Sequence, residues 1–480
     1  MKLLFLPFLL ACGLLFGQQE ANLLGTWNDP ELEGSFAYDN TYNEIWGLAI
    51  NGHEYAIIGS TAGTHFIDVT DPTQPFEAHF VAGAQQGGVV VHRDYHDYNG
   101  YLYAVCDEGA SSLQIIDFRG LPDAIEVVYD SATKIQTAHN IFIDTATAKL
   151  YVFAMDGGPQ GYSAMRIYDI SDPLNLVYRG EFNNFGGLQV GHVHDGYVRD
   201  DIAFLNSGGS GFAIMNFADP STPEAIATLT DYPFRGYNHS GWLSDDARYY
   251  YMADENHGYD LKILDVSDPC ELQVVGTFDA EVANVTSIPH NQLVACNYLY
   301  VSYYYDGLRV YDISDPVNPE LTLYYDTYSA ANGSNYKGAW GVFPFLPSGN
   351  ILISDMQSGL FVFEGPSDGC DPIANLRPVD ISCLEVNAIK DHTQDSGIQI
   401  FPQPASELIQ VSLTLPKSQE KVNAQLLDIN GRSVQRFENV SLQEGQQTLT
   451  FDLGTGISAG VYYLQLQSEQ WQVVEKVLIQ

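Results

Sequence analysis

Regularly spaced histidines are the residues of this sequence with the clearest potential for metal chemistry. The chain has 480 residues and 12 histidines, and several of the histidines recur at the same place in successive segments of about 50 residues. Alignment of the segments gives one equivalent position in each, occupied by Trp46, His92, His139, His194, His239, His290 and Trp340. Neutral imidazoles beside carboxylates are common ligands for zinc, iron, manganese and copper. The spacing therefore predicts that distant imidazoles meet at one site.

Acidic residues follow the second strand expected in several segments, where the loops open on the same face as the histidines. The predicted metal ligands are His139, His194, His239, His290, Asp195, Asp254 and Glu255. The rest of the predicted ligand face comprises Trp46, His92, Trp340, Asp107 and Glu108. The metal would be a divalent transition ion of unknown identity. The same spacing is also compatible with structural histidines that donate to carbonyls of the neighbouring segment.

A repeated motif supplies the elements that would position these side chains. Apolar residues, Asp, an apolar residue, a small residue and Asp-Pro occur in order, as in Ile167–Pro173 and Val310–Pro316. The marker acid or amide falls at positions 68, 117, 169, 216, 265, 312 and 364. A period near 50 residues with strand-type composition is typical of four-stranded propeller blades. The fold class predicted is all-β, a seven-bladed β-propeller, and the motif aspartates are expected to cap turns.

The two ends of the repeat region predict how the ring closes. Blade seven lacks a fourth strand, whereas Leu23–Asn28 is a left-over segment at the N-terminal end. This segment resembles Val274–Asp279, the last strand expected in blade five. It is expected to complete blade seven, which removes an open sheet edge.

Composition excludes several classes of function. Acidic residues outnumber basic ones by 60 to 20, giving a formal net charge of −40. Such a surface repels phosphate backbones and anionic lipids, so we expect no nucleic-acid partner. Outside the N-terminus the sequence predicts no transmembrane segment. It also lacks a nucleophile elbow, a Walker loop and a His-Glu-x-x-His zinc motif.

Several short motifs carry a family resemblance. Leu308–Pro316 resembles the LVIVD repeat, a propeller-forming motif of surface proteins. The ordered series that includes Thr137–Asn140, His239–Leu243 and Gly338–Trp340 is similar to the choice-of-anchor B family over about residues 40–364. That resemblance implies a surface location and assigns no activity. His92 stands where that family has tryptophan, and His96 competes with it for the same position.

The C-terminal part resembles the type IX secretion sorting domain. The matching stretches are Ile400–Ala405, Leu427–Arg432 and Ala459–Tyr463, with Gln403 where asparagine is usual. The resemblance implies handling by the type IX secretion machinery, and an extracellular or outer-membrane surface location in a Gram-negative bacterium. It also implies tail removal, with release or surface attachment.

The predicted organisation has four parts. They are a signal peptide over 1–17, the propeller over 22–364, a linker over 365–397 and a small C-terminal β-sandwich over 398–480. An alternative for the N-terminus is a lipoprotein box at Cys12. Cys370 and Cys383 are the best local disulfide pair; a bond between Cys270 and Cys296 is also compatible, which leaves Cys106 over.

The leading functional hypothesis is a non-enzymatic propeller that binds an unknown extracellular ligand or partner at the channel mouth, around a metal. One alternative is a metal-dependent hydrolase or oxidoreductase at the same histidines, with Asp195 or Glu255 as general base. Another is an adhesin that uses the outer blade surfaces.

Overall fold

The computed structural model describes residues 18–282, 286–333, 335–366, 376–387, 399–406, 408–415, 418–428, 432–437, 440–454, 457–467 and 472–480. The chain divides into two compact units, residues 1–381 and residues 382–480. Each unit is described by itself.

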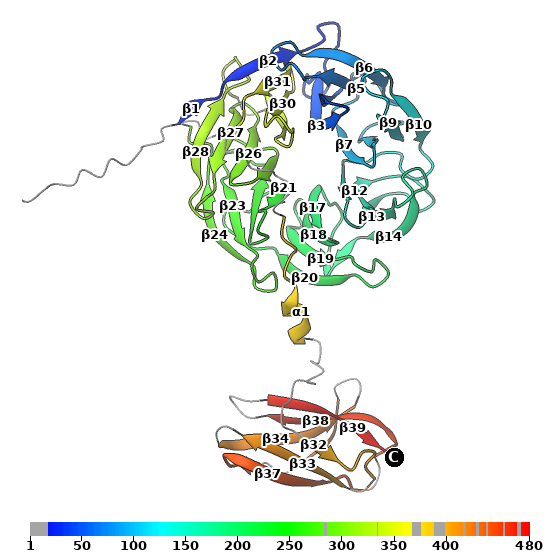
Figure 1. Cartoon of the computed structure of the whole chain (residues 1–480), viewed down its shortest axis with the longest axis vertical. Helices are drawn as coiled ribbons and strands as arrows, with labels where there is room; N and C mark the ends of the chain where they lie inside the picture. Colours follow the sequence, from blue (N-terminus) through cyan, green and yellow to red (C-terminus); the bar gives the residue numbers. More distant parts are fainter. Residues whose placement is uncertain are drawn as a thin grey trace, which may run out of the picture. The chain divides into compact units, whose positions relative to one another are not determined.

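The first unit is a β-propeller, and its described residues form seven blades around a central channel (Figure 1). Blade one comprises β3 (Tyr42–Ile50), β4 (His53–Ser60), β5 (Gly63–Asp68) and β6 (Phe76–Ala82). Blade two comprises β7 (Arg93–Tyr98), β8 (Tyr101–Cys106), β9 (Leu113–Asp117) and β10 (Glu126–Ser131). Blade three comprises β11 (Asn140–Asp144), β12 (Lys149–Met155), β13 (Ser163–Asp169) and β14 (Val177–Phe182), followed by the small hairpin β15 (Asn184–Phe185) and β16 (Leu188–Gln189).

The remaining blades repeat this order. Blade four comprises β17 (Asp195–Arg199), β18 (Ile202–Asn206), β19 (Phe212–Asn216) and β20 (Glu224–Leu229). Blade five comprises β21 (Asn238–Leu243), β22 (Tyr249–Asp254), β23 (Leu261–Asp265) and β24 (Gln273–Phe278). Blade six comprises β25 (Gln292–Ala295), β26 (Tyr298–Tyr303), β27 (Gly307–Asp312) and β28 (Glu320–Tyr325). Blade seven contains β29 (Ala339–Phe343), β30 (Ile351–Asp355) and β31 (Gly359–Phe363).

The N-terminal strand closes the ring. β2 (Leu23–Trp27) pairs antiparallel with β31 and gives blade seven its fourth strand. A two-residue strand, β1 (Gln19–Glu20), adds in parallel to the outer edge of blade six through β28. The closing pair thus joins the two ends of the repeat region (Figure 1).

The recurring aspartates cap turns. The Asp169 Oδ1 atom accepts hydrogen bonds from the Ser171 amide at 2.9 Å and from its hydroxyl at 2.7 Å. Asp265 binds Ser267 in the same way. These bonds fix the backbone between the third and fourth strands, which explains why the motif recurs.

Apolar side chains hold neighbouring blades together. Between blades five and six, for example, Tyr251 and Ile263 pack with Leu299 and Tyr311, and all four are fully buried. The innermost strands contact one another in order around the channel, which brings equivalent positions of successive blades into proximity.

Part of the predicted linker packs on the propeller. The Arg377 amide donates to the Asp245 carbonyl at 2.8 Å. The buried Arg199 guanidinium donates to the Arg377 carbonyl at 2.9 Å. This segment is therefore fixed at the end of β17, at the opposite end of the innermost strand from His194.

The second unit is a β-sandwich that begins after the short helix α1 (Ser382–Asn387). One sheet has the order β32 (Gln399–Phe401), β33 (Leu408–Leu415) and β37 (Gly445–Asp452). The other has the order β35 (Ser433–Arg436), β34 (Gln419–Leu427), β38 (Gly460–Gln467) and β39 (Gln472–Ile479), and β36 (Val440–Leu442) pairs with β34. Buried aliphatic side chains such as Val411, Leu426 and Leu466 form its core.

Candidate functional site

Five imidazoles and one indole form a closed ring at one end of the channel, which we call the histidine ring. Its members contact one another in the order His92, His139, His194, His239, His290 and Trp340. Centroids of successive members lie 4.1 to 4.6 Å apart, and Trp340 contacts His92 at 5.5 Å. Each member lies at or next to the first residues of an innermost strand, so the blade repeat itself aligns them.

Hydrogen bonds fix which imidazole nitrogen carries the proton. The Nδ1 atoms of His194 and His290 lie 3.1 and 2.6 Å from the backbone carbonyls of His239 and Trp340, respectively. A carbonyl can only accept, so each Nδ1 must donate. The Ser240 hydroxyl donates its proton to the His290 carbonyl at 2.5 Å and therefore accepts from Nδ1 of His239 at 2.9 Å. In all three neutral imidazoles the lone pair is left on Nε2.

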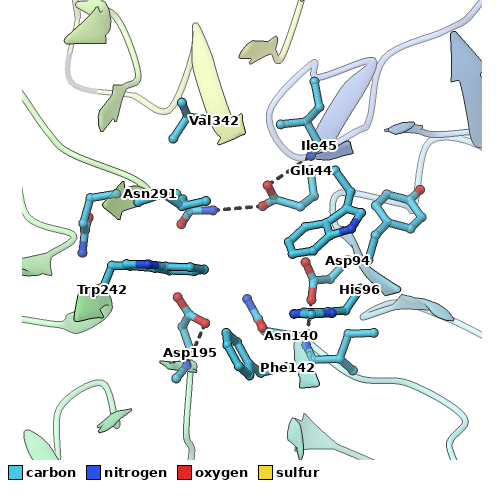
Figure 2. A pocket seen from close by; sticks show the side chains of 17 residues that line it. Glu44, Ile45, Asp94, His96, Asn140, Phe142, Asp195, Trp242, Asn291 and Val342 are labelled. Carbon is cyan, nitrogen blue, oxygen red and sulfur yellow. Dashed lines mark hydrogen bonds between the residues drawn. The ribbon is translucent and has the colours of Figure 1, made fainter. Parts of the chain in front are cut away.

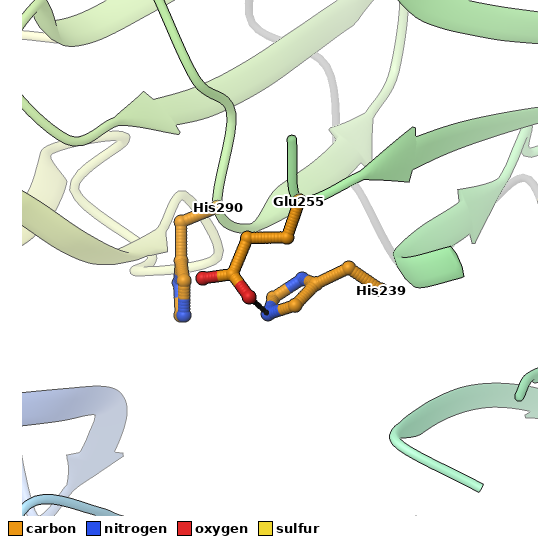
Figure 3. A group of neighbouring side chains, drawn as sticks. All are labelled: His239, Glu255 and His290. Atoms are coloured by element: carbon orange, nitrogen blue, oxygen red, sulfur yellow. Dashed lines mark ion pairs between the residues drawn. The ribbon is translucent and has the colours of Figure 1, made fainter. Parts of the chain in front are cut away.

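Two of these imidazoles meet a carboxylate in a group suited to bind a metal ion. Potential ligand atoms of His239, Glu255 and His290 all lie within 4.8 Å of one another (Figure 3). The His239 Nε2 and Glu255 Oε2 atoms are 3.8 Å apart. Two ligand atoms on one tetrahedral zinc ion, each about 2.1 Å from it, are about 3.4 Å apart. A small side-chain movement would therefore bring both atoms to coordination distance.

Burial favours the uncharged form of all three groups, which frees the imidazoles to bind a metal but requires Glu255 to lose a proton when a metal binds. It lowers the pKa of His239 well below its ordinary value and that of His290 to about 3, so both imidazoles are uncharged. Burial also raises the pKa of Glu255 to about 7. The Tyr304 hydroxyl donates to Glu255 Oε1 at 2.6 Å, which leaves Oε2 directed at His239. An outer hydrogen bond of this kind orients a metal ligand.

The other side of the ring has a different electrostatic character. His139 Nδ1 lies 2.8 Å from Asp107 Oδ2, so this imidazole donates to a carboxylate rather than to a neutral acceptor. Burial lowers the pKa of His139, but the hydrogen bond and charge of Asp107 outweigh it, and the net pKa is raised. Glu108 accepts from the amides of Val91 and His92 and fixes the loop above the ring. Burial raises its pKa.

The ring forms the floor of a cavity of about 260 Å³, which we call the mouth cavity. The ring members line it together with Val91, Asp107, Glu108, Glu255, Tyr38, Tyr304 and Tyr336. Among the described residues, its lining includes three carboxylates and no lysine or arginine. The cavity therefore favours a cation or a neutral ligand over an anion.

Three residues of the predicted site lie elsewhere, namely Trp46, Asp254 and Asp195. Trp46 is deeper in the channel, where its ring contacts His96 at 4.4 Å and its Nε1 atom donates to Asp97. Blade one has a nine-residue innermost strand, β3, and alignment from its second strand placed Trp46 too near the mouth. Trp46 is thus equivalent to His96, not to His92.

Asp254 was predicted to be a metal ligand, but in the structure it forms an ion pair with Lys262. Its Oδ2 atom lies 2.7 Å from Lys262 Nζ, and both side chains are fully buried. Its Oδ1 atom accepts from the Tyr232 hydroxyl and the Gly236 amide. It is the last residue of β22, directly before Glu255, and points to the opposite side, as successive strand residues do.

Asp195 lies one layer below the ring, in an inner chamber of about 60 Å³ (Figure 2). Glu44 and Asp94 line the same chamber, together with the aromatic rings of Phe142 and Trp242. Burial raises the pKa of Glu44 to about 7 and that of Asp195 to about 6, and it raises the pKa of Asp94 well above its ordinary value. Asp195 is therefore separated from the metal-ligand group by the histidine ring.

Glu44, Asp94, Tyr304 and Tyr336 were not among the residues predicted from the sequence. Glu44 and Asp94 each lie two residues before an inward aromatic residue, Trp46 or His96, and that shared spacing was a usable signal. The tyrosines come from loops whose conformation no repeat dictates.

The Asp195→Asn substitution is expected to stabilise the protein at alkaline pH. The pKa of Asp195 is raised from its ordinary value near 4 to about 6, so the native state binds the proton more tightly than the unfolded state does. Stability therefore falls as pH rises between these values, by up to about 3 kcal/mol for a shift of about 2 units. Urea unfolding should show the gain at pH 8 and none at pH 4.

A matched control is Asp219→Asn in an exposed turn. Hydrogen bonds from Ser221 lower the pKa of Asp219, so the pH dependence has the opposite sign and the amide should bring no gain at pH 8. Equal stability of wild-type protein and the Asp195 variant at pH 8 would contradict the prediction.

The cysteines agree with an oxidising compartment. Cys270, Cys296 and Cys383 are each disulfide-bonded, and Cys106 is a buried free thiol. Cys370, the predicted partner of Cys383, lies outside the described residues, as do the predicted signal peptide and Cys12.

Two family models match this chain. The LVIVD repeat matches residues 238–280 and 293–327, and the secretion system C-terminal sorting domain matches residues 399–480. The protein is thus a propeller with LVIVD repeats and a secretion sorting tail. The tail directs type IX secretion in Bacteroidetes, to the cell surface or the extracellular space. The choice-of-anchor B resemblance is compatible with these matches.

Solved structures resemble this chain only remotely. They include the WD40 repeats of RRP9 (TM-score 0.49, 9% identity, 72% of this chain and 99% of that chain). They also include the propeller domain of Myceliophteria thermophila Cps50 (Swd1) (TM-score 0.49, 9% identity, 72% and 100%) and a Lactobacillus plantarum protein (TM-score 0.46, 11% identity, 85% and 98%). No curated protein matches the sequence. Among the described residues, no helix has the length and apolar character needed to cross a bilayer.

Proposed function

We propose that this secreted propeller binds one divalent transition metal ion through His239, Glu255 and His290, and presents it to an extracellular ligand in the mouth cavity. The observation that carries the proposal is that ligand atoms of His239, His290 and Glu255 lie within 4.8 Å of one another, while both imidazoles keep a proton-free Nε2. Two histidines and one glutamate are a ligand set that zinc uses in sites with an open position. The cavity above the group gives an external ligand access to that position.

The wild-type protein stripped with chelator is expected to rebind zinc at one ion per chain. Binding to the native state alone stabilises it by mass action, by about 2.7 kcal/mol when free metal is 100 times the Kd. Elemental analysis after dialysis gives the stoichiometry, and thermal unfolding with and without zinc gives the stabilisation. A chain that retains no zinc, with an unchanged unfolding midpoint, would overturn the proposal.

Adhesion through the outer blade surfaces stays a prediction of the sequence. The enzyme alternative gains support from the asymmetry of the histidine ring.

A further inference from the structure

One imidazole of the histidine ring, that of His139, donates its Nδ1 proton to a carboxylate. His194, His239 and His290 donate Nδ1 protons to carbonyl or hydroxyl oxygens, whereas His139 donates to Asp107. A carboxylate partner orients the ring and stabilises its protonated form. The Nε2 lone pair of His139 is therefore more basic than those of His194, His239 and His290, although all four residues occupy equivalent positions in the blade repeat.

The position of His139 in the ring places it across from the metal-ligand group. Following the ring contacts, His194 separates it from His239 on one side. On the other side His92 and Trp340 separate it from His290. His139 and the ligand group thus line opposite sides of the same mouth cavity. A water molecule held on one side would have a proton acceptor on the other.

The charge of the mouth cavity restricts the substrate. Asp107, Glu108 and Glu255 line it, and no lysine or arginine does so in the part of the chain that the structure describes. Three carboxylates exceed the charge of one divalent ion, so the loaded cavity would keep a net negative charge and disfavour phosphate esters and carboxylates. An uncharged carbonyl compound would enter without this penalty, against the tyrosine side chains of the wall.

We propose that the metal-loaded protein hydrolyses neutral carboxylic esters, with His139 as general base and Asp107 as its positioning residue. The proposal rests on the proposed metal site. A metal ion held by His239, Glu255 and His290 would lower the pKa of a water molecule bound to it, and Nε2 of His139 would take a proton from that water as its oxygen bonds to the ester carbonyl carbon. The carbon–alkoxy bond then breaks, and the His139 imidazolium returns the proton to the departing alkoxide. One ester and one water yield one acid and one alcohol.

The test uses the full chain, loaded with zinc, and p-nitrophenyl acetate as the neutral probe. The value of kcat/KM should exceed that of the chelator-stripped protein at least about 100-fold, and bis(p-nitrophenyl) phosphate should be turned over far more slowly. His139→Gln should lower kcat/KM about 100-fold at unchanged zinc content, within the range for loss of a general base. His53→Gln, which removes an imidazole paired with Asp68 outside the mouth cavity, is the matched control and should change kcat/KM less than about threefold.

Asp107→Asn supplies a second variant. The groups that face His139 are His92, His192, His194, Asp107, Glu108 and Glu255. Loss of the Asp107 charge should move the acid limb of the pH–rate profile to lower pH, which a merely structural role would not do. Full activity of His139→Gln, or zinc-bound protein no faster than stripped protein, overturns the esterase assignment alone. Absence of bound zinc overturns the metal site as well.

Discussion

His239→Ala is expected to weaken zinc binding by more than about 100-fold while the propeller stays folded. The substitution removes one of three ligand side chains, and loss of even an outer hydrogen-bond partner typically costs about 10- to 100-fold in metal affinity. His290→Ala should behave similarly. Glu255→Gln keeps an acceptor for the Tyr304 hydroxyl but removes the charge, so it separates coordination from packing. Calorimetric titration with zinc measures each affinity.

His92→Ala is the matched control for these variants. It removes an imidazole from an equivalent ring position that lies outside the ligand group. Its affinity for zinc should remain within about threefold of wild type, far less than the loss of a ligand. Equal losses for His92 and His239 would indicate a ring that acts as one structural unit and would contradict the assignment of ligands.

Lys262→Met is expected to destabilise the propeller by about 3–5 kcal/mol, because it leaves the buried Asp254 carboxylate without its counter-charge. The pair is 2.7 Å apart and completely removed from solvent. Burial lowers the pKa of Lys262, although Asp254 opposes this effect. Denaturant unfolding should show a lower midpoint.

The double variant Asp254→Asn/Lys262→Met separates pairing from packing. Asparagine retains an acceptor for the Tyr232 hydroxyl and the Gly236 amide, so most of the lost stability should return. Zinc binding should be unchanged in the double variant, because Asp254 takes no part in the ligand group. If the single variant unfolded at the wild-type midpoint, the ion pair would carry no stability.

Much of the fold could be predicted because the repeat encodes it. The spacing of the marker residues set the number of blades, and Leu23–Trp27 could be recognised by its likeness to a fourth strand. The ring of His139, His194, His239 and His290 followed from the same period, since equivalent positions of radial sheets must meet at the channel.

The different roles of the histidines within the site could not be predicted from their spacing. Which imidazole meets Asp107 and which meets Glu255 depends on loop conformation. Asp254 and Glu255 are adjacent in sequence, yet one is buried beside Lys262 and the other lines the mouth cavity. The sequence alignment assigned Trp46 to the wrong position because it counted back from the second strand of each blade, and the innermost strand β3 of blade one is longer than its counterparts. Periodicity predicts where each blade begins. The direction of a side chain depends on the strand register, which periodicity does not give.

The pairing of β2 with β31 has a consequence for the order of assembly. β2 is synthesised before any blade but acquires its partner only after the last blade exists, so strands from the two ends of the domain close the ring. Such a non-local contact forms slowly and late. A chain still being synthesised would therefore be an unlatched series of sheets, and the shared imidazole floor would come together only when β2 pairs with β31.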